Sequence, residues 1–493
     1  MRVLYSTLIF ALFAVAGILS GCEKEPKVVH NFTVPSSYEC EFYAHTFDIK
    51  YYTSDISSGD LSVTAQADDA WINHIDYSCP NLLRISVDAN YGVQRSTVVR
   101  LNAEGMHEAR ITITQKAASR RESSHTLMFY FFGTSLSRYF NYNIEDASIA
   151  ISNGALGDNG RVMFLRQIDK TSGYIGELYV DEDSGNCAER RIKDIIIDAT
   201  RPMEECIAEN IAFMADVAPA DSYGLVLAGH GQGWVTREAL NSSSSPFNIG
   251  GDPWMPVVGA EMTRAFGENN VRVDVAQIKS AIELSNVDFD YLLFDACFMS
   301  NIESIYDLRT ITDYIIASPC EIMGRGFPYQ YTLPYLFADN DIVTNVCNAA
   351  ESYYLYYRDE YASSYRCGSV AVIDCSEVDM LAEATRALVA SANDDCDTSN
   401  LQFYEGYSRH TFFDLWGWAR LVATDMDALN NFEEQLSKTV IVKYTLPTFY
   451  SALGSAGTYP IDEEQYSGVT TSATSQTYPE YWCNTSWYKA VWE

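Results

Sequence analysis

Residues 291–301 read YLLFDACFMSN, an apolar run followed by an aspartate and a cysteine two residues apart. The run YLLF is short, aliphatic and aromatic, which is typical of a strand buried on both faces of a parallel sheet. Beyond Cys297 the apolar residues recur at helical spacing, and Ser300 or Asn301 can cap the helix that follows. Cys297 is therefore predicted at the carboxyl end of a strand and near a helix N-terminus. Open α/β sheets bind ligands at that edge, and a helix N-terminus stabilises a thiolate.

A cysteine at a strand end does not by itself identify a nucleophile. Most buried cysteines are inert, and Cys375 ends the similar apolar run GSVAVIDC. A partner base is needed, and His230 ends another predicted buried strand in YGLVLAGHGQGW. If the two strands are neighbours, imidazole and thiol face each other, which is the arrangement for covalent acyl transfer. Gly229, Gly231 and Gly233 would let backbone N–H groups approach a substrate closely.

The motif HGQGW followed by FDACFMSNIESIYDL closely resembles the clostripain family of cysteine peptidases. The resemblance extends to DYIIASPCEIMGRGFPY and LMFYFFGTSLSRYF, and it covers roughly residues 124–493. It implies a caspase-like fold and a catalytic dyad of His230 and Cys297. It also implies an oxyanion held by the backbone N–H groups of Gly231 and Cys297, with peptides or proteins as substrates.

Asp295 is the candidate specificity residue. Side chains two apart on a strand point the same way, so Asp295 should share a face with Cys297. An unpaired carboxylate there would raise the thiol pKa, whereas a cationic substrate side chain would pair with it, arginine with two hydrogen bonds. In the family the matching aspartate lines a pocket for Arg or Lys, so cleavage after Arg, with Lys weaker, is predicted. Glu321 is the nearest candidate for a second acidic wall, although the neighbouring MGRG is basic. The alternative is that Asp295 only ties down the strand–helix turn.

Self-cleavage is a further expectation from the resemblance. Clostripain-like enzymes are commonly cut by themselves between the two motifs, and here that segment is long and rich in Ser, Gly and Pro. It offers Arg237, Arg264 and Arg272, and the linker near residue 120 adds Arg120 and Arg121. A polar loop of this kind is expected to be accessible to an active site.

Length and composition limit the function classes. A chain of 493 residues should form two or three domains, and 47% hydrophobic with 20% charged residues is typical of a globular protein. The formal net charge of −33 should repel nucleic acid, so no nucleic-acid partner is predicted. The 12 cysteines show no C-x-x-C pair and no zinc spacing. No metal site and no required cofactor are predicted, and calcium dependence is left open.

The first 22 residues predict export. Arg2 precedes an apolar stretch that ends in LSGC, which is too short to span a membrane stably. LSGC resembles a bacterial lipobox, which implies lipidation of Cys22 and a lipid anchor. The acidic residues after Cys22 resemble the surface-export signal of some Gram-negative lipoproteins, so a surface-exposed outer-membrane lipoprotein is expected. An ordinary signal peptide cleaved nearby is the alternative.

Residues 31–117 alternate apolar and polar residues in short runs separated by turn sequences, which predicts an all-β, immunoglobulin-like sandwich. Trp71, RISVDAN and ITITQK resemble a BACON domain. That resemblance leaves two roles open, contact with glycan or mucin and a simple spacer. The spacer is favoured because this copy shows no aromatic cluster, and packing is the more usual role for one tryptophan.

The rest of the chain alternates strands and helices. After a polar linker over 118–126, a peptidase domain over 127–493 is predicted, with a C-terminal subdomain from about 376. The expected fold is an α/β caspase-like domain with a mostly parallel sheet flanked by helices. Strands are expected in LMFYFF, RVMFLRQ, YGLVLAG, YLLFDAC, YIIAS and GSVAVID, and helices near 190–217, near 275–285 and after the cysteine.

Three functions are compatible with these features. The leading one is a surface-anchored cysteine endopeptidase. A catalytically silent surface-binding or adhesion protein that uses the β-sandwich is the alternative, although both His230 and Cys297 are intact. A thiol redox protein is disfavoured by the lack of a C-x-x-C pair.

Overall fold

The chain divides into two units, residues 1–117 and 118–493. The predicted signal with Cys22, and also Arg120, Arg121 and Arg272, lie outside the residues that the structure describes. Within the described part, no helix is long and apolar enough to cross a membrane. The computed structural model describes residues 30–42, 44–54, 61–90, 93–117, 123–181, 183–241, 263–264, 273–393 and 395–493.

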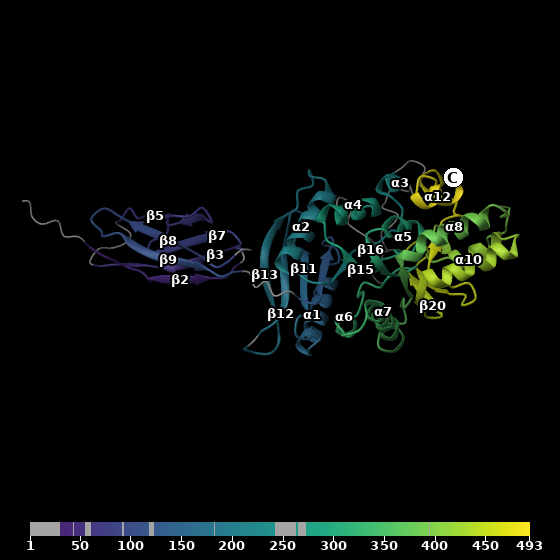
Figure 1. The fold of residues 1–493 in the computed structure, drawn as a ribbon, viewed down its shortest axis with the longest axis horizontal. Helices are drawn as coiled ribbons and strands as arrows, with labels where there is room; N and C mark the ends of the chain where they lie inside the picture. The colour runs from purple at the N-terminus through teal and green to yellow at the C-terminus, as the bar shows by residue number, and fades with distance from the viewer. Residues whose placement is uncertain are drawn as a thin grey trace, which may run out of the picture. The chain divides into compact units, whose positions relative to one another are not determined.

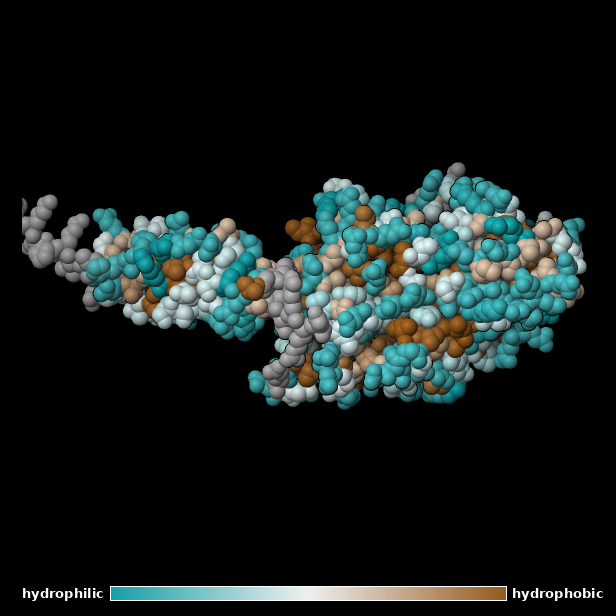
Figure 2. Space-filling view, in the orientation of Figure 1, coloured by the Kyte–Doolittle hydropathy of each residue, from teal (hydrophilic) through white to brown (hydrophobic). Residues whose placement is uncertain are grey.

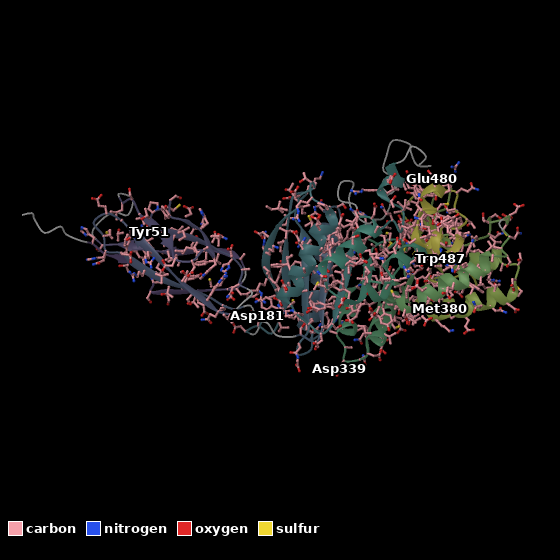
Figure 3. The ribbon with its side chains drawn as sticks, turned by 45° about the horizontal axis from the view of Figure 1, so that its top comes forward. Tyr51, Asp181, Asp339, Met380, Glu480 and Trp487 are labelled. Carbon is pink, nitrogen blue, oxygen red and sulfur yellow. The ribbon has the colours of Figure 1, made fainter. Side chains whose placement is uncertain are left out.

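The first unit holds a four-stranded sheet in the order β2-β9-β8-β5 and a three-stranded sheet in the order β3-β7-β6 (Figure 1). Alternate residues of β7, β8 and β9 point inward, so that a single apolar core forms, as expected for half-buried strands. Tyr51, labelled in Figure 3, is almost fully buried in that core. The strands are β1 (Phe32–Thr33), β2 (Ser37–Cys40), β3 (His45–Lys50), β4 (Tyr52–Thr53), β5 (Thr64–Ala67), β6 (Ile72–Asp76), β7 (Leu82–Val87), β8 (Arg95–Asn102) and β9 (Ala109–Gln115).

Trp71 packs at the edge of this core. Its ring is partly buried against the apolar cluster, and the Arg95 guanidinium carbon lies 4.6 Å from the ring centroid. A cation over an indole face is a stabilising contact within the domain. Trp71 therefore has a packing role at the edge of the core.

The second unit is built on a nine-stranded mixed sheet in the order β13-β12-β11-β10-β14-β15-β16-β17-β19 (Figure 1). The five central strands, from β11 to β16, pair in parallel, whereas both flanks pair antiparallel. This confirms the α/β class. The strands are β10 (Thr126–Phe131), β11 (Arg161–Gln167), β12 (Ser172–Val180), β13 (Cys187–Ile196), β14 (Tyr223–Ala228), β15 (Phe289–Asp295), β16 (Thr312–Ala317), β17 (Val370–Asp374) and β19 (Val440–Tyr444).

Helices cover both faces of the sheet. One face carries α1 (Ser137–Ser152), α6 (Tyr329–Leu336) and α7 (Ile342–Asp359), which contact each other in that order. The other face carries α2, α4, α5 and α8, again packed in sequence, as Figure 1 shows. Their bounds, with those of the remaining helices, are α2 (Met203–Val217), α3 (Arg237–Asn241), α4 (Val275–Ser285), α5 (Ile302–Leu308), α8 (Val378–Val389), α9 (Leu415–Val422), α10 (Met426–Thr439), α11 (Pro479–Trp482) and α12 (Ser486–Trp492).

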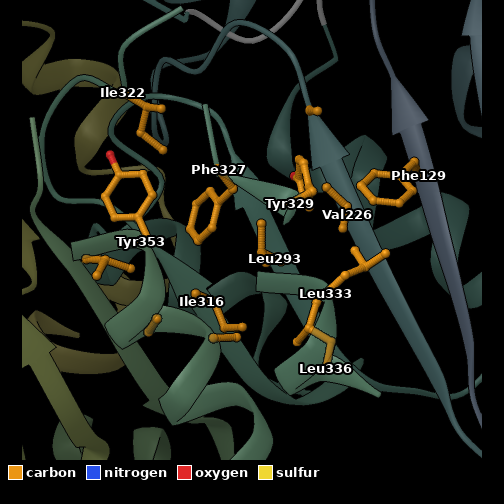
Figure 4. Close-up of a cluster of buried hydrophobic side chains, with 14 of the residues drawn as sticks. Phe129, Val226, Leu293, Ile316, Ile322, Phe327, Tyr329, Leu333, Leu336 and Tyr353 are labelled. Carbon is orange, nitrogen blue, oxygen red and sulfur yellow. The ribbon is translucent and has the colours of Figure 1, made fainter. Parts of the chain in front are cut away.

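One row of side chains shows how the central strands build the core. Phe129, Val226, Leu293 and Ile316 are register partners on four adjacent strands, and all are fully buried. Figure 4 shows them facing the apolar residues of α6, including Leu333. Strands buried on both faces need continuous apolar runs, which explains why YLLF and YGLVLA lack a polar stripe.

One predicted helix is corrected. The segment near 190–217 was expected to be a single helix, but its first part, Cys187–Ile196, is the edge strand β13. It pairs antiparallel with β12 along its length and buries Ile192. Tertiary pairing overrides the local helical preference of AERRIK. Only Met203–Val217 forms the helix.

The C-terminal region begins with α8 and ends in short strands and helices that pack onto the second unit. Its two-stranded pairs are β18 (Phe413–Asp414) with β22 (Thr470–Thr471), and β20 (Thr448–Ser451) with β21 (Gly457–Pro460). Trp487 of α12, labelled in Figure 3, is fully buried. The face of this unit seen in Figure 2 is largely hydrophilic with small hydrophobic areas, in keeping with the net charge of −33.

Candidate active site

The histidine and the cysteine follow adjacent parallel strands. Ala228, the last residue of β14, is the register partner of Asp295, the last residue of β15. His230 and Cys297 each lie two residues beyond these partners. The Gly229 N–H donates to the Asp295 carbonyl at 3.4 Å, so the pairing continues past the strand ends. The two loops therefore leave the sheet side by side.

The turn that presents Cys297 is strained. Phe298, the next residue, has a φ of 58°, which is unusual for a bulky side chain. Its buried ring stacks on Phe412 at a centroid distance of 4.9 Å, and its N–H donates to the Cys320 carbonyl. Such strain costs about 1–3 kcal/mol and persists where surrounding packing enforces it. Asn301 then caps α5 by accepting from the Ser304 N–H, as one of the two predicted caps.

The loop after β14 lies directly against the cysteine. A Cβ at Gly231 would overlap the backbone of Cys297, so only glycine allows this approach. His230 Nε2 lies 3.0 Å from the Ser135 hydroxyl, in the loop between β10 and α1. The imidazole is therefore oriented by a third loop that sequence reasoning did not assign to the site.

The Cys297 thiol is enclosed. Its side chain is almost fully buried, and the Ile322 N–H donates to Sγ at 3.3 Å. Burial raises the pKa of Cys297 well above its ordinary value, and the charge of Glu321 adds to that shift. Backbone hydrogen bonds from Ile322 and Arg264 oppose it. In this state the thiol is held in its neutral form.

The backbone of Arg264 lies directly against the backbone N–H groups of Gly231 and Cys297. Its carbonyl oxygen accepts from the Cys297 N–H at 3.1 Å and from the Gly231 N–H at 3.4 Å. These are the two donors that the sequence predicts for the oxyanion. The Arg264 N–H donates to the Ile322 carbonyl at 2.9 Å, and the preceding Thr263 forms an antiparallel bridge with Met323. Thr263–Arg264 therefore runs antiparallel to Ile322–Met323, beside Cys297.

The Arg264 guanidinium is fully buried and uses all five of its N–H groups. Nη1 donates to the Asp295 carboxylate at 2.7 Å and to the Asp295 carbonyl at 3.2 Å. Nη2 donates to Asn143 Oδ1 at 2.8 Å and to the Arg325 carbonyl at 3.1 Å, and Nε donates to the Gly324 carbonyl at 3.0 Å. The shape and the acceptors of this cage match a planar guanidinium.

Asp295 supplies the countercharge. Its carboxylate also accepts from the Tyr329 hydroxyl at 2.9 Å and from the Phe327 N–H at 3.2 Å. Burial raises the pKa of Asp295, and the Arg264 guanidinium and these donors oppose that shift. The predicted partner for Asp295 was a substrate cation, and the structure provides this chain's own Arg264.

The basic MGRG stretch forms the wall of the cage. Gly326 has a φ of 72°, and a Cβ there would overlap the Arg264 guanidinium and the Asp295 carboxylate. The Arg325 side chain pairs with Asp146 of α1 at 2.7 Å. This ion pair compensates the charge of the Arg325 side chain. The backbone carbonyl of Arg325 faces the cage and accepts from Arg264 Nη2.

The Glu321 carboxylate does not contact the Arg264 guanidinium. All five guanidinium N–H groups donate elsewhere, and the Glu321 carboxylate instead accepts from the Thr263 hydroxyl at 2.6 Å and from the Ala452 N–H at 3.0 Å. It also accepts from the Ser451 hydroxyl. Burial raises the pKa of Glu321 to about 7. Glu321 therefore contacts the residue before the arginine.

The three candidate self-cleavage arginines differ in their surroundings. Arg264 lies in the cage beside Cys297. Arg237 is exposed at the first residue of α3, and its N–H donates to Asp274. Arg272 lies outside the described residues. Arg264 is fully buried.

A C-terminal segment contacts both the histidine motif and α5, the helix that follows Cys297. Trp234, in the histidine motif, donates from its indole nitrogen to the Ser472 hydroxyl at 2.8 Å. The Ser472 N–H donates at 2.8 Å to Glu303 of α5, which also accepts from the Trp482 indole. The histidine motif and α5 are therefore supported by residues more than 160 positions later in the chain. Among the residues described, no group of three His, Cys, Asp or Glu side chains could hold a metal ion.

Several contributors to the site were missed from the sequence. Asn143 lies on the buried face of α1 beside Ile144 and Ala147, and an amide in that apolar stripe was the available signal. Tyr329 and the Gly324 carbonyl gave no such signal, because their roles depend on contacts made only in the folded chain.

The chain is similar to known proteins in sequence and in fold. The clostripain family model matches residues 135–454. A secreted C11 cysteine protease from Bacteroides thetaiotaomicron, called iotapain, is 27% identical, with 75% of this chain and 100% of that chain covered and a TM-score of 0.64. The Bacteroides thetaiotaomicron C11 protease in complex with an irreversible peptide inhibitor is 25% identical, with 75% and 99% covered and a TM-score of 0.61.

An inactive zymogen of a C11 protease from Parabacteroides distasonis is 26% identical, with 76% of this chain and 99% of that chain covered and a TM-score of 0.60. No curated protein matches the sequence. The family match spans the histidine and cysteine motifs and most of the second unit. The chain therefore belongs to the clostripain family of cysteine peptidases and is a cysteine endopeptidase.

Proposed function

We propose that this enzyme cleaves peptide bonds after arginine through a His230–Cys297 dyad, and that the bond after Arg264 is its own first substrate. One observation carries the proposal. The Arg264 carbonyl accepts from the N–H groups of Cys297 and Gly231 while its guanidinium is paired with Asp295. A substrate arginine needs both interactions at once, one at the reacting carbonyl and one at the side chain.

The chemistry follows from these contacts. The Cys297 sulfur attacks the carbonyl carbon of the arginine, and His230 takes the thiol proton. Negative charge then develops on the carbonyl oxygen, where the two N–H groups stabilise it. His230 returns the proton to the leaving amine as the C–N bond breaks, which leaves an acyl-enzyme on Cys297. Water, deprotonated by His230, hydrolyses the thioester and restores the thiol.

Preference for arginine over lysine follows from the number of donors. The cage offers five acceptor contacts, and a guanidinium fills them with five N–H groups. An ammonium has three donors on a single nitrogen. Lysine would therefore leave buried acceptors without a partner, which is costly.

The first experiment maps self-cleavage. The purified wild-type chain is incubated at neutral pH, and the products are identified by intact mass and N-terminal sequencing. A new N-terminus at residue 265 is expected, whereas Cys297→Ala and His230→Ala remain whole. Cys375→Ala is the matched control, because Cys375 also directly follows a strand, and it should convert like wild type. A wild-type chain that stays single and active, or that is cut only elsewhere, would contradict the assignment.

The second experiment measures specificity. Fluorogenic peptides that differ only in the residue before the reporter, Arg, Lys, Asn or Asp, are offered to the self-cleaved enzyme. Arginyl peptides should give the highest kcat/KM, with lysyl peptides weaker. Preference for asparaginyl or aspartyl peptides would refute the role proposed for Asp295.

Surface anchoring is a separate part of the proposal. The support is the LSGC sequence, which resembles a lipobox, at residues that the structure does not describe. Cys22→Ser should release the protein from the membrane fraction or block its maturation. Mass spectrometry that finds an unmodified mature N-terminus downstream of Cys22 would rule out the lipid anchor.

For the β-sandwich we propose a spacer role. The packing of Trp71 under Arg95 supports this choice, because the one tryptophan of the unit is engaged within the domain. The full chain is expected to pass through a mucin column without retention. Specific retention, abolished by glycan competition, would favour the binding role instead.

A further inference from the structure

Thr263, the residue before Arg264, lies in a second buried polar site. Its side chain is almost fully buried, and its hydroxyl donates to Glu321 Oε2 at 2.6 Å. The antiparallel bridge to Met323 holds Thr263 in extended backbone, so its side chain and that of Arg264 point to opposite sides. The two side chains enter two different sites, one built on Asp295 and one on Glu321.

The Glu321 carboxylate is fixed from several directions. Oε2 also accepts from the Ala452 N–H at 3.0 Å, and Oε1 accepts from the Ser451 hydroxyl. Ser451 Oγ in turn accepts from the Gly406 N–H at 3.0 Å and from the Leu453 N–H at 3.2 Å. The acceptor is therefore in place before any substrate binds. If Thr263 leaves, Oε2 loses one donor and a buried polar oxygen needs another.

We propose that Glu321 is the base of a subsite for the side chain that precedes the arginine, and that it selects threonine or serine there. This inference rests on the proposed function, because it treats Thr263–Arg264 as a bound substrate. The Thr263 hydroxyl oxygen is bonded to Cβ and lies 2.6 Å from Oε2, so the site needs a donor one bond beyond Cβ. Threonine and serine place a donor at that distance. Valine has the shape of threonine without the donor, and the ammonium of lysine lies well beyond it.

The test uses peptides that share arginine at the cleaved position and differ only in the preceding residue. Self-cleaved wild-type enzyme is assayed at pH 8, above the pKa of about 7 that burial gives Glu321. The threonine peptide should exceed the valine peptide about 10- to 100-fold in kcat/KM, because a hydrogen bond to a charged acceptor contributes roughly 1.5–3 kcal/mol. Serine should lie close to threonine, and alanine close to valine.

A variant links the preference to Glu321. In Glu321→Leu, which cannot accept, the ratio of threonine to valine should fall below about 3-fold, since the remaining difference is one of packing alone. The ratio is independent of any general loss of activity. If Glu321→Leu does not fold, the same comparison is made within the chain: Thr263→Val should slow self-cleavage about as much, and Thr263→Ser should not.

The outcomes separate this inference from the function on which it depends. If arginyl peptides are cleaved but threonine and valine are accepted equally, the subsite is wrong and the arginine specificity stands. Preference for lysine or valine over threonine also overturns it, as does a threonine preference that survives in Glu321→Leu. If no arginyl peptide is cleaved, the proposed function fails and the subsite falls with it.

Discussion

Replacing Arg264 by lysine should slow self-cleavage by about 100-fold. The guanidinium makes five contacts, with the Asp295 carboxylate and carbonyl, with Asn143, and with the carbonyls of Gly324 and Arg325. An ammonium offers three donors, so at least two of the five contacts are lost. At about 1.5 kcal/mol for each hydrogen bond to a charged group, the loss is about 3 kcal/mol. Since each 1.4 kcal/mol is a factor of ten in rate, the expected factor is about 100.

The assay follows the disappearance of the full-length chain at neutral pH by intact mass, at several protein concentrations. Concentration-independent conversion indicates cleavage within one molecule. Arg237→Lys is the matched control, because Arg237 is exposed on α3 and makes none of these contacts; it should convert at the wild-type rate. If Arg264→Lys converts within about threefold of wild type, the five-contact reasoning is refuted. An equal slowing in Arg237→Lys would show that the effect is not specific to the cage.

Three further predictions concern the same site. Asn143→Ala should reduce the ratio of arginyl to lysyl peptide cleavage by about tenfold, because the Nη2 acceptor at 2.8 Å is lost, and unchanged ratios would remove Asn143 from the specificity site. Asp295→Asn should lower kcat/KM on arginyl peptides by about 30-fold or more, since removing one partner of a buried charge pair costs roughly 2–5 kcal/mol. The melting temperature of the variant is measured separately to follow folding. In uncut His230→Ala, iodoacetamide should modify Cys297 far more slowly than the exposed Cys79 at pH 7, and the modification of Cys297 should become faster as the pH rises. The reason is that burial raises the pKa of Cys297 and only the thiolate reacts. Mass mapping that finds Cys297 modified first would contradict the enclosed, neutral thiol.

Much of the fold was predictable because its signals are local. The apolar runs that became β10, β11, β14, β15, β16 and β17 lie at the predicted positions, and Asn301 caps α5 as one of two predicted residues. The edge strand β13 was missed, since its charged sequence becomes a strand only by pairing with β12. In the nine-stranded sheet, parallel pairing is confined to the central strands. The direction of each strand depends on the connections between strands, which the hydrophobic periodicity of the sequence does not indicate.

Some residues of the candidate site could likewise be predicted from the sequence, and others could not. His230, Gly231, Asp295 and Cys297 stand within two short motifs, so their types and order were readable from the sequence. The role of Arg264 was not, because three arginines of the segment looked equivalent and only the folded chain brings one of them to Asp295. The sequence also allowed Glu321 to be predicted near the site. Which part of a substrate Glu321 contacts depends on the path of the backbone past Ile322 and Met323.

The position of Arg264 along the chain has a consequence for quaternary structure. A cut after it would separate β10–β14, which carry His230, from β15–β19, which carry Cys297, so the break would run between the two central strands of the sheet. The two polypeptides would meet along the whole β14–β15 ladder and through the helix pairs α1–α6 and α2–α4 on opposite faces. Neither half could close a core alone, so the products should form an obligate heterodimer with one catalytic residue on each subunit. Its activity per molecule is then expected to withstand dilution, and only denaturant should part the subunits.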